Sequence, residues 1–186
     1  MAYDFRNVTV LVVEDNQPMC DMVLSLLDAF GIKRAHSARN GEEGYKAYLK
    51  HKPDVIIADW MMKPVDGILF TQKIRTNPGS PNPYVPIILM TGFSEKKRVV
   101  TARDSGVTEF LVKPFTARDL YKRLAQIIER PRQFVKTEVF FGPDRRRKQE
   151  EHFEGSIKRF DDNQLDMNKT ISKPNKYDQE KDKLKK

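Results

Sequence analysis

Short apolar runs alternate with helical patterns over the first 130 residues of the chain. The runs predict five strands, of which those at 8–13 and 55–59 are almost continuously apolar, as in strands buried on both faces. The strand ranges are 8–13, 33–37, 55–59, 86–91 and 109–112. Apolar residues at three- and four-residue spacing predict five helices between and after them. The helix ranges are 19–30, 41–49, 67–76, 95–105 and 117–128.

Five strands that each precede a helix predict an α/β fold with a doubly wound parallel sheet and helices on both faces. Right-handed crossovers leave few topologies open. Several helix boundaries carry their own signals, with Asn40 and Thr116 as N-caps and Gly31 as a stop. The pattern by itself indicates no function.

The chain changes character after Arg130. Residues 131–186 hold 13 apolar residues in 56, close to half the density of residues 1–130. We therefore expect a folded domain at 6–130 and a charged, largely irregular and partly disordered tail at 131–186. In that tail, residues 134–141 are apolar enough to pack on the domain or on a partner as an extended segment, and 142–144 predict a turn.

Composition excludes several classes of protein. No apolar run approaches the length of a membrane span, and the N-terminus has no apolar signal-peptide core. A single cysteine, Cys20, rules out an internal disulfide or a cysteine-built zinc site, and the three histidines lack metal-ligand spacing. We therefore expect a cytoplasmic protein without a membrane span.

Polar side chains occur where the predicted strands end. Glu14 and Asp15 follow the first strand, Asp59 ends the third, Thr91 ends the fourth and Lys113 follows the fifth. The carboxyl ends of parallel strands share one edge of the sheet, where ligands bind in open α/β folds. We therefore expect three carboxylates, one hydroxyl and one ammonium to converge there.

That set of groups has a definite chemistry. Crowded carboxylates repel unless a cation intervenes, and oxygen ligands without His or Cys select a hard cation such as Mg²⁺. Lys113 can neutralise a carboxylate and hold a phosphoryl oxygen, to which Thr91 can donate a hydrogen bond. A carboxylate among these groups can accept a phosphoryl group, because the transfer depends on positioning and charge neutralisation.

Over residues 6–130 this arrangement resembles the receiver domain of two-component response regulators. The loop after Asp59 is also similar, with Asp66-Gly67 at the family's distance, although Lys63 stands where the family has proline and Pro64 follows it. The resemblance implies the strand order 2-1-3-4-5 and a cis Lys113-Pro114 peptide bond.

The resemblance also implies roles for individual residues. Asp59 would be the phosphoacceptor. Mg²⁺ would be held by Asp15, Asp59 and the main-chain carbonyl of Met61, with Glu14 acting through a metal-bound water.

Further roles concern the switch and its lifetime. Lys113 would contact the phosphoryl group, Thr91 would be the switch hydroxyl and Phe110 the switch aromatic. Met61 and Phe93 would flank the path of hydrolytic water. Both are apolar, so we expect slow autodephosphorylation.

The resulting hypothesis is a single-domain response regulator, a signalling protein and not an enzyme in its own right. A histidine kinase or histidine phosphotransfer protein would phosphorylate Asp59 in a Mg²⁺-dependent reaction. A downstream protein would bind the basic face of helix 4, strand 5 and helix 5. The sequence leaves two alternatives open. One is a degenerate receiver that acts as a constitutive interaction module.

The other alternative is a phosphorylation-controlled regulator whose basic tail binds nucleic acid. The tail contains a basic cluster at 145–148, but acidic residues follow at once and no aromatic stacking pattern accompanies it. Nor do residues 131–186 show the apolar stripes of a helix-turn-helix domain. We therefore do not expect nucleic acid to be the partner.

Overall fold

A parallel five-stranded sheet forms the centre of the protein. The structure, a computed structural model, describes residues 4–92, 104–136 and 141–144. The strands of the sheet are β1 (Thr9–Val13), β2 (Arg34–Ala38), β3 (Val55–Asp59), β4 (Ile87–Thr91) and β5 (Glu109–Val112). All neighbouring pairs are parallel, and the order is β2-β1-β3-β4-β5. The predicted fold class and strand order are thus confirmed.

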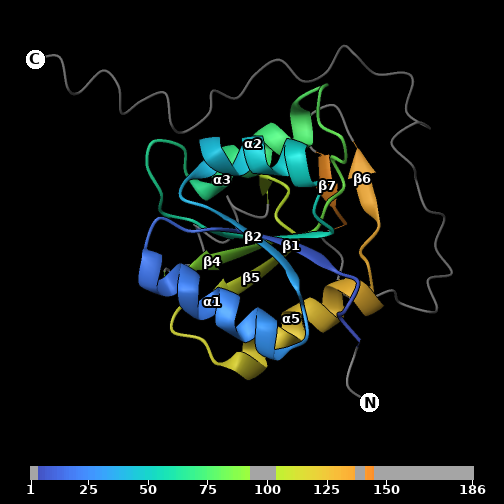
Figure 1. Ribbon diagram of the computed structural model, residues 1–186. Helices are drawn as coiled ribbons and strands as arrows, with labels where there is room; N and C mark the ends of the chain where they lie inside the picture. Colours follow the sequence, from blue (N-terminus) through green and yellow to red (C-terminus); the bar gives the residue numbers. More distant parts are fainter. Residues whose placement is uncertain (1–3, 93–103, 137–140, 145–186) are drawn as a thin grey trace, which may run out of the picture. The chain divides into compact units, whose positions relative to one another are not determined.

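Helices cover both faces of this sheet. They are α1 (Gln17–Ala29), α2 (Gly41–His51), α3 (Gly67–Thr76) and α5 (Ala117–Glu129). One face carries α1 and α5 and the other carries α2 and α3 (Figure 1). The remaining predicted helix, at 95–105, overlaps residues 93–103, which lie outside the described part of the chain. No helix among the described residues combines the length and apolarity that crossing a bilayer requires.

Local signals place the helix ends. The Asn16 side chain accepts a hydrogen bond from the Met19 N–H at 3.0 Å and so caps α1. Thr116 and Asp119 form a reciprocal capping box at the start of α5. After α1 the chain reverses through Gly31 at φ +89°, a left-handed conformation that glycine adopts without strain.

Two apolar cores, one on each face, hold the layers together. The α1 and α5 side is built around Val23, Leu27, Leu120 and Leu124. On the other side Tyr48, Phe70 and Ile74 pack against the sheet. The central strands β3 and β4 are buried throughout, which explains their unbroken apolar runs.

A small antiparallel hairpin follows the last helix, made of β6 (Phe134–Lys136) and β7 (Phe141–Pro143). Tyr84 contacts it edge-to-face, with ring centroids 5.3 Å from Phe134 and 5.2 Å from Phe141. The predicted turn at 142–144 is wrong for Gly142 and Pro143, which lie in β7 because Gly142 pairs with Val135. Strand pairing thus overrides the Gly-Pro turn signal.

Candidate functional site

Three carboxylates meet at the carboxyl edge of the sheet. Oxygen atoms of Glu14, Asp15 and Asp59 lie within 4.8 Å of one another. Glu14 and Asp59 are buried, at 2% and 7% exposure, whereas Asp15 is exposed. They converge because β1 and β3 are adjacent parallel strands that end together, with Val13 opposite Ala58. Burial of two like charges side by side is unfavourable without a cation between them.

Lys113 supplies one such cation. Its Nζ lies 2.8 Å from Glu14 Oε2 and 2.8 Å from Asp59 Oδ1. Burial lowers the pKa of the Lys113 ammonium, but hydrogen bonds to the Asp59 and Glu14 carboxylates outweigh that effect and raise the pKa above its usual range. Burial raises the pKa of Glu14, helped by the charge of Asp59 and opposed by Lys113. One ammonium therefore leaves this cluster with an excess of negative charge.

The second oxygen of Asp59 points into the loop that follows β3. Asp59 Oδ2 accepts a hydrogen bond of 3.0 Å from the Met61 N–H, and the Met61 side chain is 58% exposed. Both oxygens of the carboxylate are thus held, one by Lys113 and the other by the loop backbone. Such restraint fixes its orientation at the sheet edge.

Gly67 sets the back wall of the site. A Cβ atom at this position would lie 2.2 Å from the Asp59 carbonyl oxygen and 2.7 Å from Leu89 Cδ1. The Gly67 N–H donates to the Trp60 carbonyl at 3.0 Å, which draws the start of α3 against the end of β3. Only glycine permits this approach of backbone to backbone.

Thr91 and Phe110 lie on the two strands beyond Asp59. Asp59 pairs with Met90 across β3 and β4, so Thr91 is one residue further along, and it is fully buried. Phe110 is half-buried and packs against the α2 and α3 core. The Lys113 N–H donates to the Thr91 carbonyl at 2.7 Å, and the Lys113-Pro114 peptide bond is cis, as expected. Phe93 lies outside the described residues.

The donor set suits a hard divalent cation. Three carboxylates and one ammonium leave the cluster about two charges short of neutrality, and every ligand atom is oxygen. Asp15 and Asp59 would hold Mg²⁺ directly, with the Met61 carbonyl as the main-chain ligand and Glu14 behind a water molecule. The exposed position of Asp15 leaves the cluster open to solvent on that side.

Comparisons with known proteins agree with this geometry. Residues 10–125 match the family model described as the response regulator receiver domain. The chain belongs to this family. Chemotaxis protein CheY-3 of Vibrio cholerae is 29% identical over 125 residues, which cover 67% of this chain and 95% of that protein. The phosphate regulon transcriptional regulatory protein PhoB of Pseudomonas aeruginosa is 27% identical over 122 residues, 66% of this chain. This chain therefore matches only 52% of the length of PhoB.

Solved structures show the same fold. A putative response regulator from Chloroflexus aurantiacus superposes with a TM-score of 0.61 at 26% identity, covering 66% of this chain and 98% of that one. Chemotaxis response regulator CheY4 of Vibrio cholerae gives 0.60 at 28% identity, with 64% and 98% covered. The family model ends at residue 125, before β6.

Membership places the chain among the signalling proteins of two-component systems. Receiver domains carry a phosphoacceptor aspartate, bind Mg²⁺ at an acidic cluster, and interact with histidine kinases or phosphotransfer proteins. The cluster of Glu14, Asp15 and Asp59 provides the corresponding acidic groups here.

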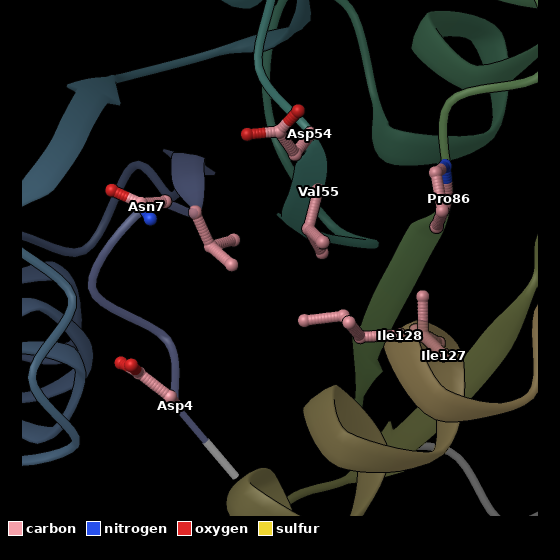
Figure 2. A pocket seen from close by; sticks show the side chains of 8 residues that line it. Asp4, Asn7, Asp54, Val55, Pro86, Ile127 and Ile128 are labelled. Carbon is pink, nitrogen blue, oxygen red and sulfur yellow. The ribbon is translucent and has the colours of Figure 1, made fainter.

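A hollow of about 470 Å³ lies at the opposite edge of the sheet, between the start of β3 and the end of α5 (Figure 2). Its walls combine polar and apolar groups, with Val55 on one side and Ile127 and Ile128 on the other. Its two carboxylates are engaged, since Asp54 accepts from the Thr9 N–H at 2.8 Å and Asp4 pairs with Arg6. The hollow therefore lacks the convergent reactive groups that the acidic edge has.

Sequence reasoning missed one charged cluster. Glu109, the first residue of β5, is only 3% exposed and pairs with Arg123 and Arg132. The available signal was an acidic residue at the start of a predicted strand, with arginines 14 and 23 positions later. Glu109, Arg123 and Arg132 lie on three different segments, so no periodicity within one helix or strand relates them. Only the tertiary structure brings these side chains together.

Proposed function

We propose that this chain is a single-domain response regulator that accepts a phosphoryl group on Asp59 from a histidine kinase or a histidine phosphotransfer protein. The observation that carries the proposal is the Asp59 carboxylate, buried beside Glu14 and held by Lys113 at 2.8 Å. A carboxylate restrained among opposite charges is set up for nucleophilic attack on phosphorus.

In this reaction an Asp59 oxygen forms a bond to phosphorus as the bond from phosphorus to the donor breaks. Lys113 neutralises charge on the transferred group, and Thr91 supplies the hydroxyl that turns toward it. Mg²⁺, when bound, offsets the negative charge that Asp15, Asp59 and the phosphoryl oxygens bring together. Phe110, the switch aromatic, changes its position when Thr91 moves.

Output would pass to a protein partner through the face formed by the fourth helix, β5 and α5. On the described part of that face, α5 carries Arg118 and Lys122, both exposed, and Arg123, which also pairs with Glu109. Val112 on β5 is 46% exposed. A basic face with an exposed apolar residue suits an acidic protein partner, whose association would weaken with added salt. Because its donors act inside the cell, we place the chain in the cytoplasm.

The phosphorylated state would be long-lived. The positions that flank the hydrolytic water carry Met61 and Phe93, and neither side chain can orient water by a hydrogen bond. Replacing Met61 with asparagine should shorten the phosphoryl lifetime. A lifetime of only seconds in the wild-type protein would contradict this part of the proposal.

The decisive test is acetyl phosphate with Mg²⁺, followed by intact mass. Wild type and an Asp28→Asn control on the exposed end of α1 should each gain one phosphoryl group, and Asp59→Asn should gain none. Equal phosphorylation of Asp59→Asn would refute the proposal. Partner binding that is the same for wild type and Asp59→Asn would favour the constitutive module. A salt-sensitive DNA gel shift that is lost on removal of residues 145–186 would favour nucleic-acid binding.

A further inference from the structure

Glu109 ties the segment after α5 to the sheet. Its side chain is 3% exposed and receives three donors. Arg123 Nη1 and Gln126 Nε2, both on α5, each lie 3.3 Å from a carboxylate oxygen, and Arg132 Nη2 also donates to the carboxylate. Arg132 belongs to the segment between α5 and β6 and is 23% exposed. A buried carboxylate depends on such partners, so Arg132 is one of the three residues that hold the amino end of β5 through Glu109.

The hairpin that follows is anchored nearby. The Arg75 guanidinium lies 5.1 Å from the centre of the Phe134 ring and donates to the Gly106 carbonyl at 3.0 Å. A Cβ atom on Gly106 would come within 3.0 Å of the Phe141 carbonyl oxygen. Gly106 lies three residues before Glu109, so both anchors hold the amino end of β5. We call residues 132–136 and 141–144 the brace.

The free energy that favours docking of the brace on the domain is small. Its strands have three residues each, too few to be stable without the domain beneath them. Docking also covers Arg75, whose Nη2 finds no hydrogen-bond partner among the described residues. An unpaired buried donor costs free energy that water would return on undocking. Changes at β5 can therefore shift the balance between the docked and undocked brace.

The other end of β5 leads into the phosphoacceptor site. The strand has only four residues, from Glu109 to Val112, and Lys113 follows it directly. Lys113 donates from its backbone to the Thr91 carbonyl and from its side chain to Glu14 and Asp59. One short strand thus carries the brace anchor at one end and the phosphoryl-binding lysine at the other.

We propose that Arg132 is a positioning residue of the receiver: with the brace docked, it holds β5 so that Lys113 meets Asp59, and phosphorylation in turn tightens the docked brace. This inference rests on the proposed phosphorylation of Asp59. The reciprocal effect follows from linkage, because groups that favour the same arrangement of β5 favour one another.

The first test compares Arg132→Gln with Arg130→Gln, which removes the same charge from an exposed residue two positions earlier. Phosphorylation by acetyl phosphate should be slower by about two-fold or more in Arg132→Gln. It should be unchanged in Arg130→Gln, and Arg132→Lys should restore most of the rate because a single cation still reaches Glu109. Equal rates for the two glutamine variants would overturn the inference and leave the proposed function intact.

The second test does not require phosphorylation. Hydrogen exchange of the Lys113 backbone amide should be faster in Arg132→Gln than in Arg130→Gln, because β5 then loses one of the contacts that hold its amino end. In the wild type, phosphorylation should slow exchange in β6 and β7, and acetyl phosphate should not do so in Asp59→Asn. If the wild type takes up no phosphoryl group, the proposed function fails. The exchange rate of the Lys113 amide in Arg132→Gln then still tests whether the brace affects the site. Unchanged exchange at Lys113 would refute the link.

Discussion

The two ends of β5 hold buried carboxylates in opposite ways. At the carboxyl end, the buried carboxylates of Glu14 and Asp59 share one ammonium, that of Lys113, and the exposed carboxylate of Asp15 lies beside them. At the amino end, the single carboxylate of Glu109 meets two guanidinium groups. The first cluster is short of positive charge and can take up a cation and a phosphoryl group, whereas the second is already neutralised by the protein. Burial of acidic groups therefore marks a reactive site only where their charge is left incomplete.

Removing the one ammonium should have the largest effect on this contrast. In Mg²⁺-free buffer, Lys113→Met should lower the free energy of unfolding by about 3 kcal/mol, because it leaves two buried carboxylates without their partner. Urea denaturation measures the change. Lys63→Met, at an exposed position, should stay within about 0.5 kcal/mol of wild type. Comparable losses in both variants would mean that the carboxylates do not depend on Lys113.

Mg²⁺ should distinguish the two clusters. Binding should raise the free energy of unfolding by about 2.7 kcal/mol at a hundred times the dissociation constant. The gain should be largely lost in Asp15→Asn, which removes a predicted ligand, and retained in Glu109→Gln at the other end. Thermal unfolding with and without Mg²⁺ tests this, and a gain that persists in Asp15→Asn would argue against a metal site there.

Two glycines allow the crowding near the brace to be measured. Gly106 and Gly31 both adopt φ +89°, but a Cβ on Gly31 meets nothing within 4 Å, whereas on Gly106 it meets Arg75 Cγ and the Phe141 carbonyl at 3.0 Å. Gly31→Ala should cost about 1 kcal/mol from backbone strain. Gly106→Ala should cost about 1 kcal/mol more, because the brace must shift. If urea denaturation gives the same loss in the free energy of unfolding for both variants, the brace can shift away from the added Cβ at no cost.

The stability of the protein should depend weakly on pH through Glu14, in the cluster at the carboxyl end of β5. Burial raises the pKa of Glu14 above its ordinary value of 4.5. Between pH 4.5 and the raised pKa, Glu14 is protonated more fully in the folded protein than in the unfolded chain. The free energy of unfolding therefore falls as pH rises through that interval. Glu14→Gln should lack this contribution. We expect the stability of wild type relative to Glu14→Gln to decline with rising pH in Mg²⁺-free buffer, and a rise would reverse the assigned sign.

Much of the domain was predictable because its signals are local. The runs at β3 and β4 have the composition of strands buried on both faces, and Asn40, Gly31 and Thr116 set helix ends that the structure retains. The site was predictable for a topological reason, since parallel strands of one sheet end at a common edge. The roles of Thr91, Phe110 and Met61 stay predictions until phosphorylation is measured.

The sequence alone determined the alternation of strands and helices and which polar residues end the strands, because both are encoded in short-range patterns. The tertiary structure alone decided that Gly142 and Pro143 extend a strand, and that Arg132 reaches Glu109 from beyond α5. Those outcomes depend on pairing and burial between segments far apart in the chain, and local propensity carries no record of such contacts.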